Sequence, residues 1–119
     1  MLLLLALFAC DPEPKVVTEV LTDQGTVCLN DGGLAEVSFP GCLSSSCDAV
    51  VESSCTVDFA DGVATVHASV TIEREQGDCT ADCGFIQVTC DMPLVEDPDT
   101  AVFSYAGETT PFTAECQPF

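Results

Sequence analysis

Positive charge is nearly absent from this sequence. Only Lys15 and Arg74 oppose twenty acidic residues, and the formal net charge is −18. A field of this sign repels phosphate backbones and anionic lipid headgroups, and no basic patch is present to overcome it. Nucleic-acid binding is therefore excluded, and the acidic residues are typical of a solvated surface that keeps a protein soluble.

The residue types of common catalytic sites are also scarce. The chain has no Trp, a single Tyr and a single His, His67. A glycosidase normally places its carboxylates in an aromatic-lined cleft, which this composition does not favour. The run Ser44-Ser45-Ser46 is not part of a Gly-x-Ser-x-Gly elbow, and His67 would be the only histidine base available to it. We therefore predict that the protein is not an enzyme.

The chain starts with a short apolar run. Leu2 to Ala9 contains no polar residue, but it is far shorter than the ~20 residues that span a membrane as a helix. A short apolar segment that ends in a small residue, here Ala9, is the pattern of a cleaved export signal. The alternative is a buried N-terminal strand in which Cys10 forms an ordinary disulfide.

The ending Leu7-Phe8-Ala9-Cys10 resembles the lipobox of bacterial lipoproteins. In that family the signal is cut before the cysteine, whose thiol carries a diacylglyceryl group and whose new amino terminus is acylated. The resemblance implies that residues 1–9 are a signal peptide, that Cys10 is the lipidation site and that residues 10–14 form a short tether. The protein would then be exported and lipid-anchored to a bacterial membrane, on its periplasmic face or at the cell surface.

The nine cysteines support this interpretation, because removing Cys10 leaves an even number. An exported chain lies in an oxidising compartment, where thiols pair with one another. The spacing of Cys42 from Cys47, and of Cys79 from Cys83, leaves open the alternative of a four-thiolate zinc site. We predict four disulfides, made by Cys28, Cys42, Cys47, Cys55, Cys79, Cys83, Cys90 and Cys116.

The segment after residue 14 is typical of short β-strands separated by turns. Asp61-Gly62 is a strong type I′ hairpin signal, and the apolar residues that follow it alternate strictly with polar ones. Counting back across this turn places Phe59 opposite Ala64 and Cys55 opposite Ala68. Similar patterns predict no helix and further strands at residues 15–22, 25–29, 34–39, 84–90, 100–105 and 109–116.

Eight short strands in one domain, residues 15–119, match the size and strand count of an immunoglobulin-like fold. We predict an all-β protein, a single antiparallel β-sandwich stapled by disulfides. Cys55 and Cys90 fall on the core faces of their strands and are predicted to bond across the sandwich. If residue 55 opposes residue 68, residue 47 opposes about residue 76, provided that no bulge intervenes. Two disulfides are therefore expected to connect the Cys42 and Cys47 loop with the Cys79 and Cys83 loop.

The function prediction is less specific. Carboxylates and carbonyls are preferred Ca²⁺ ligands, but the acidic turns at residues 30–33, 78–82 and 96–99 lack the spacing of an EF-hand loop. We predict a lipid-anchored cell-envelope protein without a cofactor, a non-enzymatic interaction or structural module with a protein or glycan partner. The alternative is a calcium-binding accessory protein of the envelope that uses these acidic loops.

Overall fold

The computed structural model describes residues 15–116, so the predicted signal peptide, Cys10 and the tether at residues 10–14 lie outside the described residues. Within them the chain forms β-strands and no helix, and no segment is a helix long and apolar enough to cross a membrane. The strands are β1 (Val16–Thr22), β2 (Thr26–Leu29), β3 (Ala35–Leu43), β4 (Asp48–Ala60), β5 (Val63–Glu75), β6 (Gly84–Thr89), β7 (Val102–Tyr105) and β8 (Glu108–Pro111).

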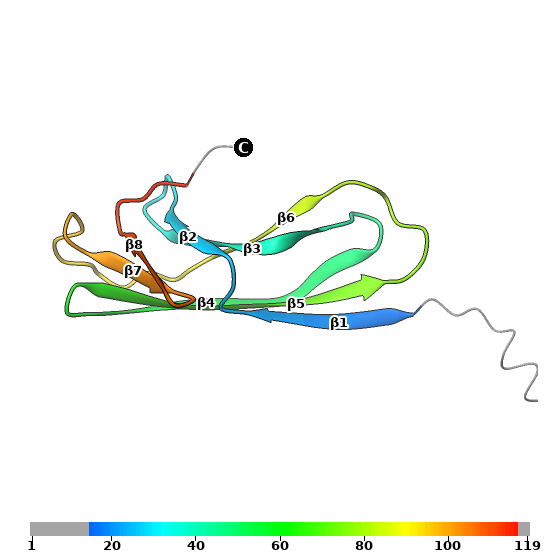
Figure 1. Cartoon of the computed structure of the whole chain (residues 1–119), viewed down its shortest axis with the longest axis horizontal. Coiled ribbons are helices and arrows are strands. Elements are labelled where there is room, and N and C mark those ends of the chain that lie inside the picture. The colour runs from blue at the N-terminus through cyan, green and yellow to red at the C-terminus, as the bar shows by residue number, and fades with distance from the viewer. Residues whose placement is uncertain (1–14, 117–119) are drawn as a thin grey trace, which may run out of the picture.

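The strands form two sheets that lie one above the other (Figure 1). The first sheet is built around β5, which pairs along its whole length with β4 on one edge. On its other edge β5 pairs with β1 at one end and with β7 at the opposite end, and β8 pairs with β7. The second sheet has the order β2-β3-β6.

The β4–β5 hairpin has the register that the sequence predicts. Cys55 pairs with Ala68 and Phe59 with Ala64. The turn residues Asp61 and Gly62 have φ values of 53° and 77°, as a type I′ turn requires. The local dipeptide and the strict alternation are sufficient here, because a two-residue turn sets the register of both strands.

The prediction that residue 47 lies opposite residue 76 is wrong by one position. The register of β4 on β5 shifts between Val50 and Glu52, so that Cys47 lies opposite Glu75 and its carbonyl accepts a hydrogen bond from the Glu75 N–H at 2.9 Å. The extra residue, Val51, is a β-bulge, and an insertion of one residue displaces every later pair by one.

Two strand boundaries and one strand direction also differ from the prediction. β3 continues past Phe39 to Leu43 across an irregular register, and β8 ends at Pro111 rather than at residue 116. β7 runs parallel to β5, so the fold is not wholly antiparallel. The reason is that the chain crosses to the second sheet as β6 between these two strands, and such a crossover returns the chain in the same direction.

One core is shared by the two sheets. It takes its side chains from alternate positions of the strands, as the period of two dictates. Phe103 is fully buried and stacks at 4.7 Å between ring centroids on Phe112, which follows β8. The core residues with at most 4% exposure are Ala35, Val37, Ala64, Val66, Ala68, Val70, Ile72, Ile86, Cys90, Ala101, Phe103 and Tyr105.

Disulfides tie this core together and close the chain. Cys55 of the first sheet bonds Cys90 at the end of β6, which is the pairing that the sequence predicts. Cys28 of β2 bonds Cys116, so the C-terminal segment is fixed beside the second sheet. Backbone hydrogen bonds from the Leu29 N–H to the Ala114 carbonyl and from the Cys116 N–H to the Leu29 carbonyl hold it there.

Tyr105 joins the end of β7 to the connection between β1 and β2. Its hydroxyl donates a hydrogen bond of 2.6 Å to the carbonyl oxygen of Gln24, and its side chain is buried. Burial, followed by the negative charge of Asp23, raises the pKa of the Tyr105 phenol to about 12. The phenol is neutral in the folded protein, and it contributes stability that is fully present below the ordinary value near 10.

We therefore expect stability to fall as the pH rises from about 10 through about 12, because the unfolded chain loses the Tyr105 proton first. Tyr105 is the only tyrosine, so the ultraviolet absorbance of tyrosinate reports this single group. In the folded protein its midpoint should lie near 12. A midpoint at the ordinary value in a protein that is still folded would contradict the buried, hydrogen-bonded phenol.

Candidate functional site

Two disulfides lie together at the end of the molecule where β1 begins. Cys42 bonds Cys83 and Cys47 bonds Cys79, with Cα atoms 5.0 and 5.6 Å apart. The predicted cross-pairing of the two loops is thus the arrangement in the structure, which also selects one of the two possible sets of cross-pairs. All four sulfur atoms are in disulfides, so these cysteines do not supply the four thiolates that the alternative zinc site requires.

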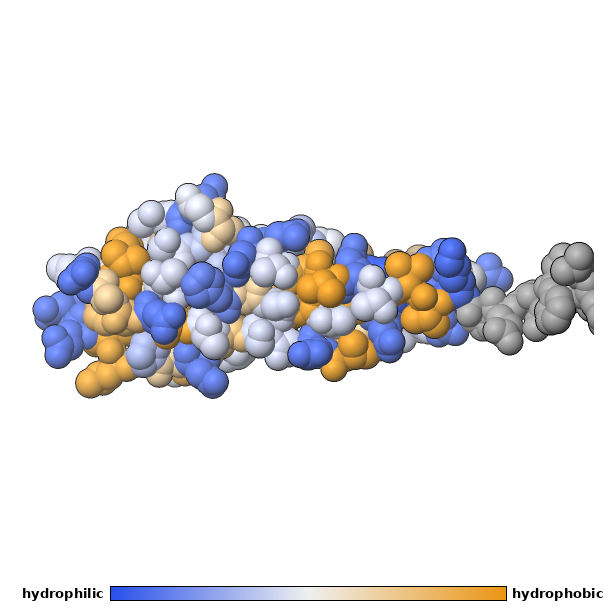
Figure 2. Space-filling view, turned by 90° about the horizontal axis from the view of Figure 1, so that it is seen from below, coloured by the Kyte–Doolittle hydropathy of each residue, from blue (hydrophilic) through white to orange (hydrophobic). Residues whose placement is uncertain are grey.

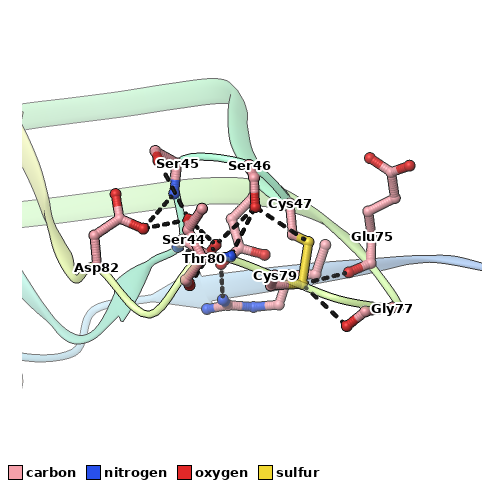
Figure 3. The surroundings of a disulfide bond; sticks show 11 residues. Ser44, Ser45, Ser46, Cys47, Glu75, Gly77, Cys79, Thr80 and Asp82 are labelled. Carbon is pink, nitrogen blue, oxygen red and sulfur yellow. Dashed lines mark hydrogen bonds and ion pairs between the residues drawn. A yellow bond between two sulfur atoms is a disulfide. The ribbon is translucent and has the colours of Figure 1, made fainter.

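The serine run between Cys42 and Cys47 faces the opposite loop (Figure 3). The Ser44 hydroxyl lies 2.9 Å from the Thr80 hydroxyl, the Ser45 N–H donates to the Asp82 carboxylate at 3.2 Å, and the Thr80 N–H donates to the Ser46 hydroxyl at 2.9 Å. These hydroxyl groups therefore connect the two loops alongside the disulfides.

The Asp82 carboxylate is stabilised in its charged form by this network. The hydroxyl of Thr80 donates to it, and a hydrogen bond from Ser45 adds to the effect. Together they lower the pKa of Asp82 from 3.8 to about 2. Hydrogen bonds to a carboxylate favour its ionised form, so Asp82 supports the loop contact throughout the range above about pH 2.

The structure does not bring His67 to these serines. His67 pairs with Thr56 on the outer face of the first sheet, as predicted, and its Nδ1 lies 3.7 Å from a carboxylate oxygen of Asp23. His67 lies eight positions along β5 from Glu75, whose N–H donates a backbone hydrogen bond to the Cys47 carbonyl. At ~3.3 Å per residue this is roughly 26 Å along the strand. Asp23, which the sequence pattern did not identify, is the carboxylate beside His67. Both residues are remote from the serine loop, so they do not form a catalytic site with its hydroxyl groups.

Arg74 connects several segments at the double-disulfide end of the molecule. Its guanidinium group contacts Glu19 of β1 at 2.9 Å and Asp48 of β4 at 3.0 Å, and it donates to the carbonyl of Cys42 at 3.3 Å. Asp48 also accepts the Ser44 N–H at 2.7 Å. The only arginine thus ties three strands to the cysteine loop. Sequence reasoning missed this role, although the lone Arg among so many acids is a usable signal.

Two of the turns considered for calcium are closed by hydrogen bonds of their own. The side-chain oxygen of Asn30 accepts hydrogen bonds from the N–H groups of Gly32 and Leu34 at 2.9 and 3.0 Å. The turn that starts at Asp97 is closed by a bond from the Thr100 N–H to the Asp97 carbonyl. Among residues 15–116 no group of three or more His, Cys, Asp or Glu side chains is arranged to hold a metal ion.

A shallow groove of about 280 Å³ lies on the outer face of the second sheet. Its walls combine carboxylates, hydroxyls, an amide and a disulfide, and they come from β2, β3, β6 and the C-terminal segment. The sequence pattern did not identify it, because these positions are the polar halves of alternating strands. The lining residues are Thr26, Cys28, Glu36, Ser38, Gln87, Glu115 and Cys116.

Comparison with protein-family models, curated proteins and solved structures finds no match to this chain.

Proposed function

We propose that this chain is a lipid-anchored protein of a bacterial cell envelope that acts as a non-enzymatic interaction or structural module. In this proposal its two sheets are an immunoglobulin-like β-sandwich held at a membrane by Cys10. The observation that carries the proposal is the position of the N-terminal end of β1, which lies at the double-disulfide end of the molecule (Figure 1).

The opposite end of the molecule is formed by a turn and a loop. The turn at Asp61-Gly62 and the loop at residues 91–101 lie there, because Asp91 bridges to Thr56 and the Val102 N–H bonds the Gly62 carbonyl. β4 and β5 have 13 residues each, which at ~3.3 Å per residue corresponds to about 43 Å of rigid hairpin. A tether at residues 10–14 would therefore place the disulfide end at the membrane and hold these loops away from it.

The lipid anchor is tested by intact-mass analysis of the full chain produced in a host that processes lipoproteins. We expect a mature N-terminus at Cys10 carrying a diacylglyceryl group and an N-acyl chain, and recovery of the protein with the membrane fraction. The matched control is Cys10→Ala, which should leave the fold intact and abolish acylation. A mature N-terminus at another residue, or an unlipidated Cys10, would overturn the proposal.

The calcium alternative is tested on the soluble domain. A ligand that binds only the folded state raises the melting temperature as its concentration exceeds its Kd. We expect no large shift when millimolar Ca²⁺ is added. The side-chain oxygen of Asn30 already accepts two hydrogen bonds within its own turn, and the Asp82 carboxylate accepts one from Ser45 of the facing loop. A large upward shift of the melting temperature would favour the calcium-binding accessory protein over the interaction module.

A further inference from the structure

We propose that the free edge of β1 is the docking site of the module, and that it binds an extended, lysine- or arginine-bearing strand of another protein by β-strand addition. This inference rests on the proposed function, since it names the surface and the kind of partner. Among residues 15–116 no strand pairs with this edge, because β1 pairs only with β5.

The backbone groups that point away from β5 follow from the hydrogen-bond pattern. The Gln76 N–H donates to the Lys15 carbonyl, and the Asp23 N–H donates to the Ala68 carbonyl. The register between these two pairs is unbroken. Bonded and non-bonded pairs alternate in an antiparallel ladder, so the odd-numbered residues of β1 bond to β5. The N–H and C=O groups at the free edge therefore belong to Val16, Thr18, Val20 and Thr22.

This edge lacks most of the features by which proteins block strand addition. Natural edge strands are protected by proline, charged side chains (lysine above all), bulges or coverage. The segment Val16–Thr22 contains no proline or lysine and has an unbroken register, and its one charged residue, Glu19, is paired with Arg74. Val16 and Val20 are 52% and 57% exposed. Figure 2 views the molecule from the side of the first sheet and shows apolar groups among hydrophilic ones towards the end where β1 begins. The free edge of β4, in contrast, is bulged at Val51 and bridged at Thr56 to Asp91.

Charge complementarity selects the occupant. Thr18 and Val16 pair with Glu73 and Glu75, whose side chains lie on the same outer face one strand away. Arg74, the only arginine, is engaged by Glu19 and Asp48. An added strand would lie about 10 Å from β5, which is two strand spacings, and a long basic side chain and a glutamate that extend towards each other can span this distance. A second copy of this chain brings 18 further negative charges instead, so self-pairing is disfavoured.

The probe is a synthetic peptide, acetyl-(Lys-Val)₄-amide, added to the folded domain at about 0.15 M salt, where long-range charge attraction is largely screened. Binding is followed by calorimetry and by amide chemical shifts, which should change along β1. The matched peptide has the same sequence with every residue's backbone nitrogen methylated, so it has the same charge but no residue N–H to donate to β1, and it should bind at least about tenfold more weakly. Equal binding of the two peptides would show attraction by charge alone and would overturn the proposal.

The protein variants test the edge itself. Val20→Pro removes an N–H that points away from β5, so the β1–β5 ladder is preserved while strand addition is blocked. Val20→Lys places a positive charge against a basic partner, and Val50→Lys, at an exposed position of β4, is its control. We expect both Val20 variants to lose about tenfold or more in affinity and Val50→Lys to bind as the parent chain does. If Val20→Pro does not fold, the two lysine variants carry the test.

Two results would overturn this inference without touching the lipid anchor. One is unchanged peptide affinity in the Val20 variants, and the other is a stable dimer of the parent chain in sedimentation that Val20→Lys dissociates. The anchor is assayed separately by the mass of Cys10, so a lipidated chain that fails to bind the peptide removes only the β1 docking site.

Discussion

Replacing both Cys55 and Cys90 with alanine should destabilise the protein by about 4 kcal/mol or more. With Cys47–Cys79 intact, the bridge closes 8 residues on one side (55 − 47) and 11 on the other (90 − 79), and chain-entropy estimates for a loop of that size give about 3 kcal/mol. Both cysteines are also buried in the core, at 7% and 1% exposure, so the missing sulfur atoms add a cavity cost. The loss is a large part of the roughly 5–15 kcal/mol that stabilises an ordinary domain.

The measurement is denaturant unfolding of the oxidised proteins, followed by far-ultraviolet circular dichroism. The matched control removes Cys42–Cys83 by the same double alanine change. That bridge is nested around Cys47–Cys79, so with the inner bridge intact it closes only 5 residues on one side (47 − 42) and 4 on the other (83 − 79). This smaller closed loop contributes about 2.5 kcal/mol, and Cys83 is exposed, so no comparable cavity cost is added. Equal losses from the two variants would contradict this ordering.

Arg74→Ala should destabilise the protein by about 2–3 kcal/mol, between the values for exposed and fully buried ion pairs. The reason is the carboxylate that the change leaves behind. The Asp48 side chain is 10% exposed, and without Arg74 its charge keeps, among residues 15–116, only the hydrogen bond from the Ser44 N–H. The Cys42 carbonyl loses a donor at the same time. Thermal and denaturant unfolding at neutral pH measure the loss.

Arg74→Lys is the control for charge. An ammonium group keeps the positive charge but lacks the planar fork that reaches Glu19, Asp48 and the Cys42 carbonyl together. We expect an intermediate loss, and a smaller one again for Glu19→Gln, because Glu19 is 45% exposed and its pairing is screened by solvent. An unchanged free energy of unfolding in Arg74→Ala would show that the contacts of Arg74 with Glu19, Asp48 and Cys42 do not stabilise the fold.

The sequence determined the parts of this fold that depend on neighbouring residues. The alternation from Ala64 to Ile72 and the Asp61-Gly62 turn specify a hairpin whose register the structure has in full up to the bulge at Val51. The hairpin pairing puts Cys55 on the core face of β4, and the separate alternation of Ile86 and Val88 puts Cys90 on the core face of its strand, so their pairing could be predicted. These inferences succeed because side-chain period and turn geometry act over a few residues.

The features that join distant segments of the chain depend on tertiary packing. The bulge at Val51, the parallel pairing of β5 with β7 and the choice of Cys42–Cys83 over its alternative depend on how the two sheets pack. The contacts of Arg74 and the free edge of β1 depend on the order of strands in the first sheet. No local pattern encodes that order, because it is set by the burial of side chains from strands that lie far apart in the chain.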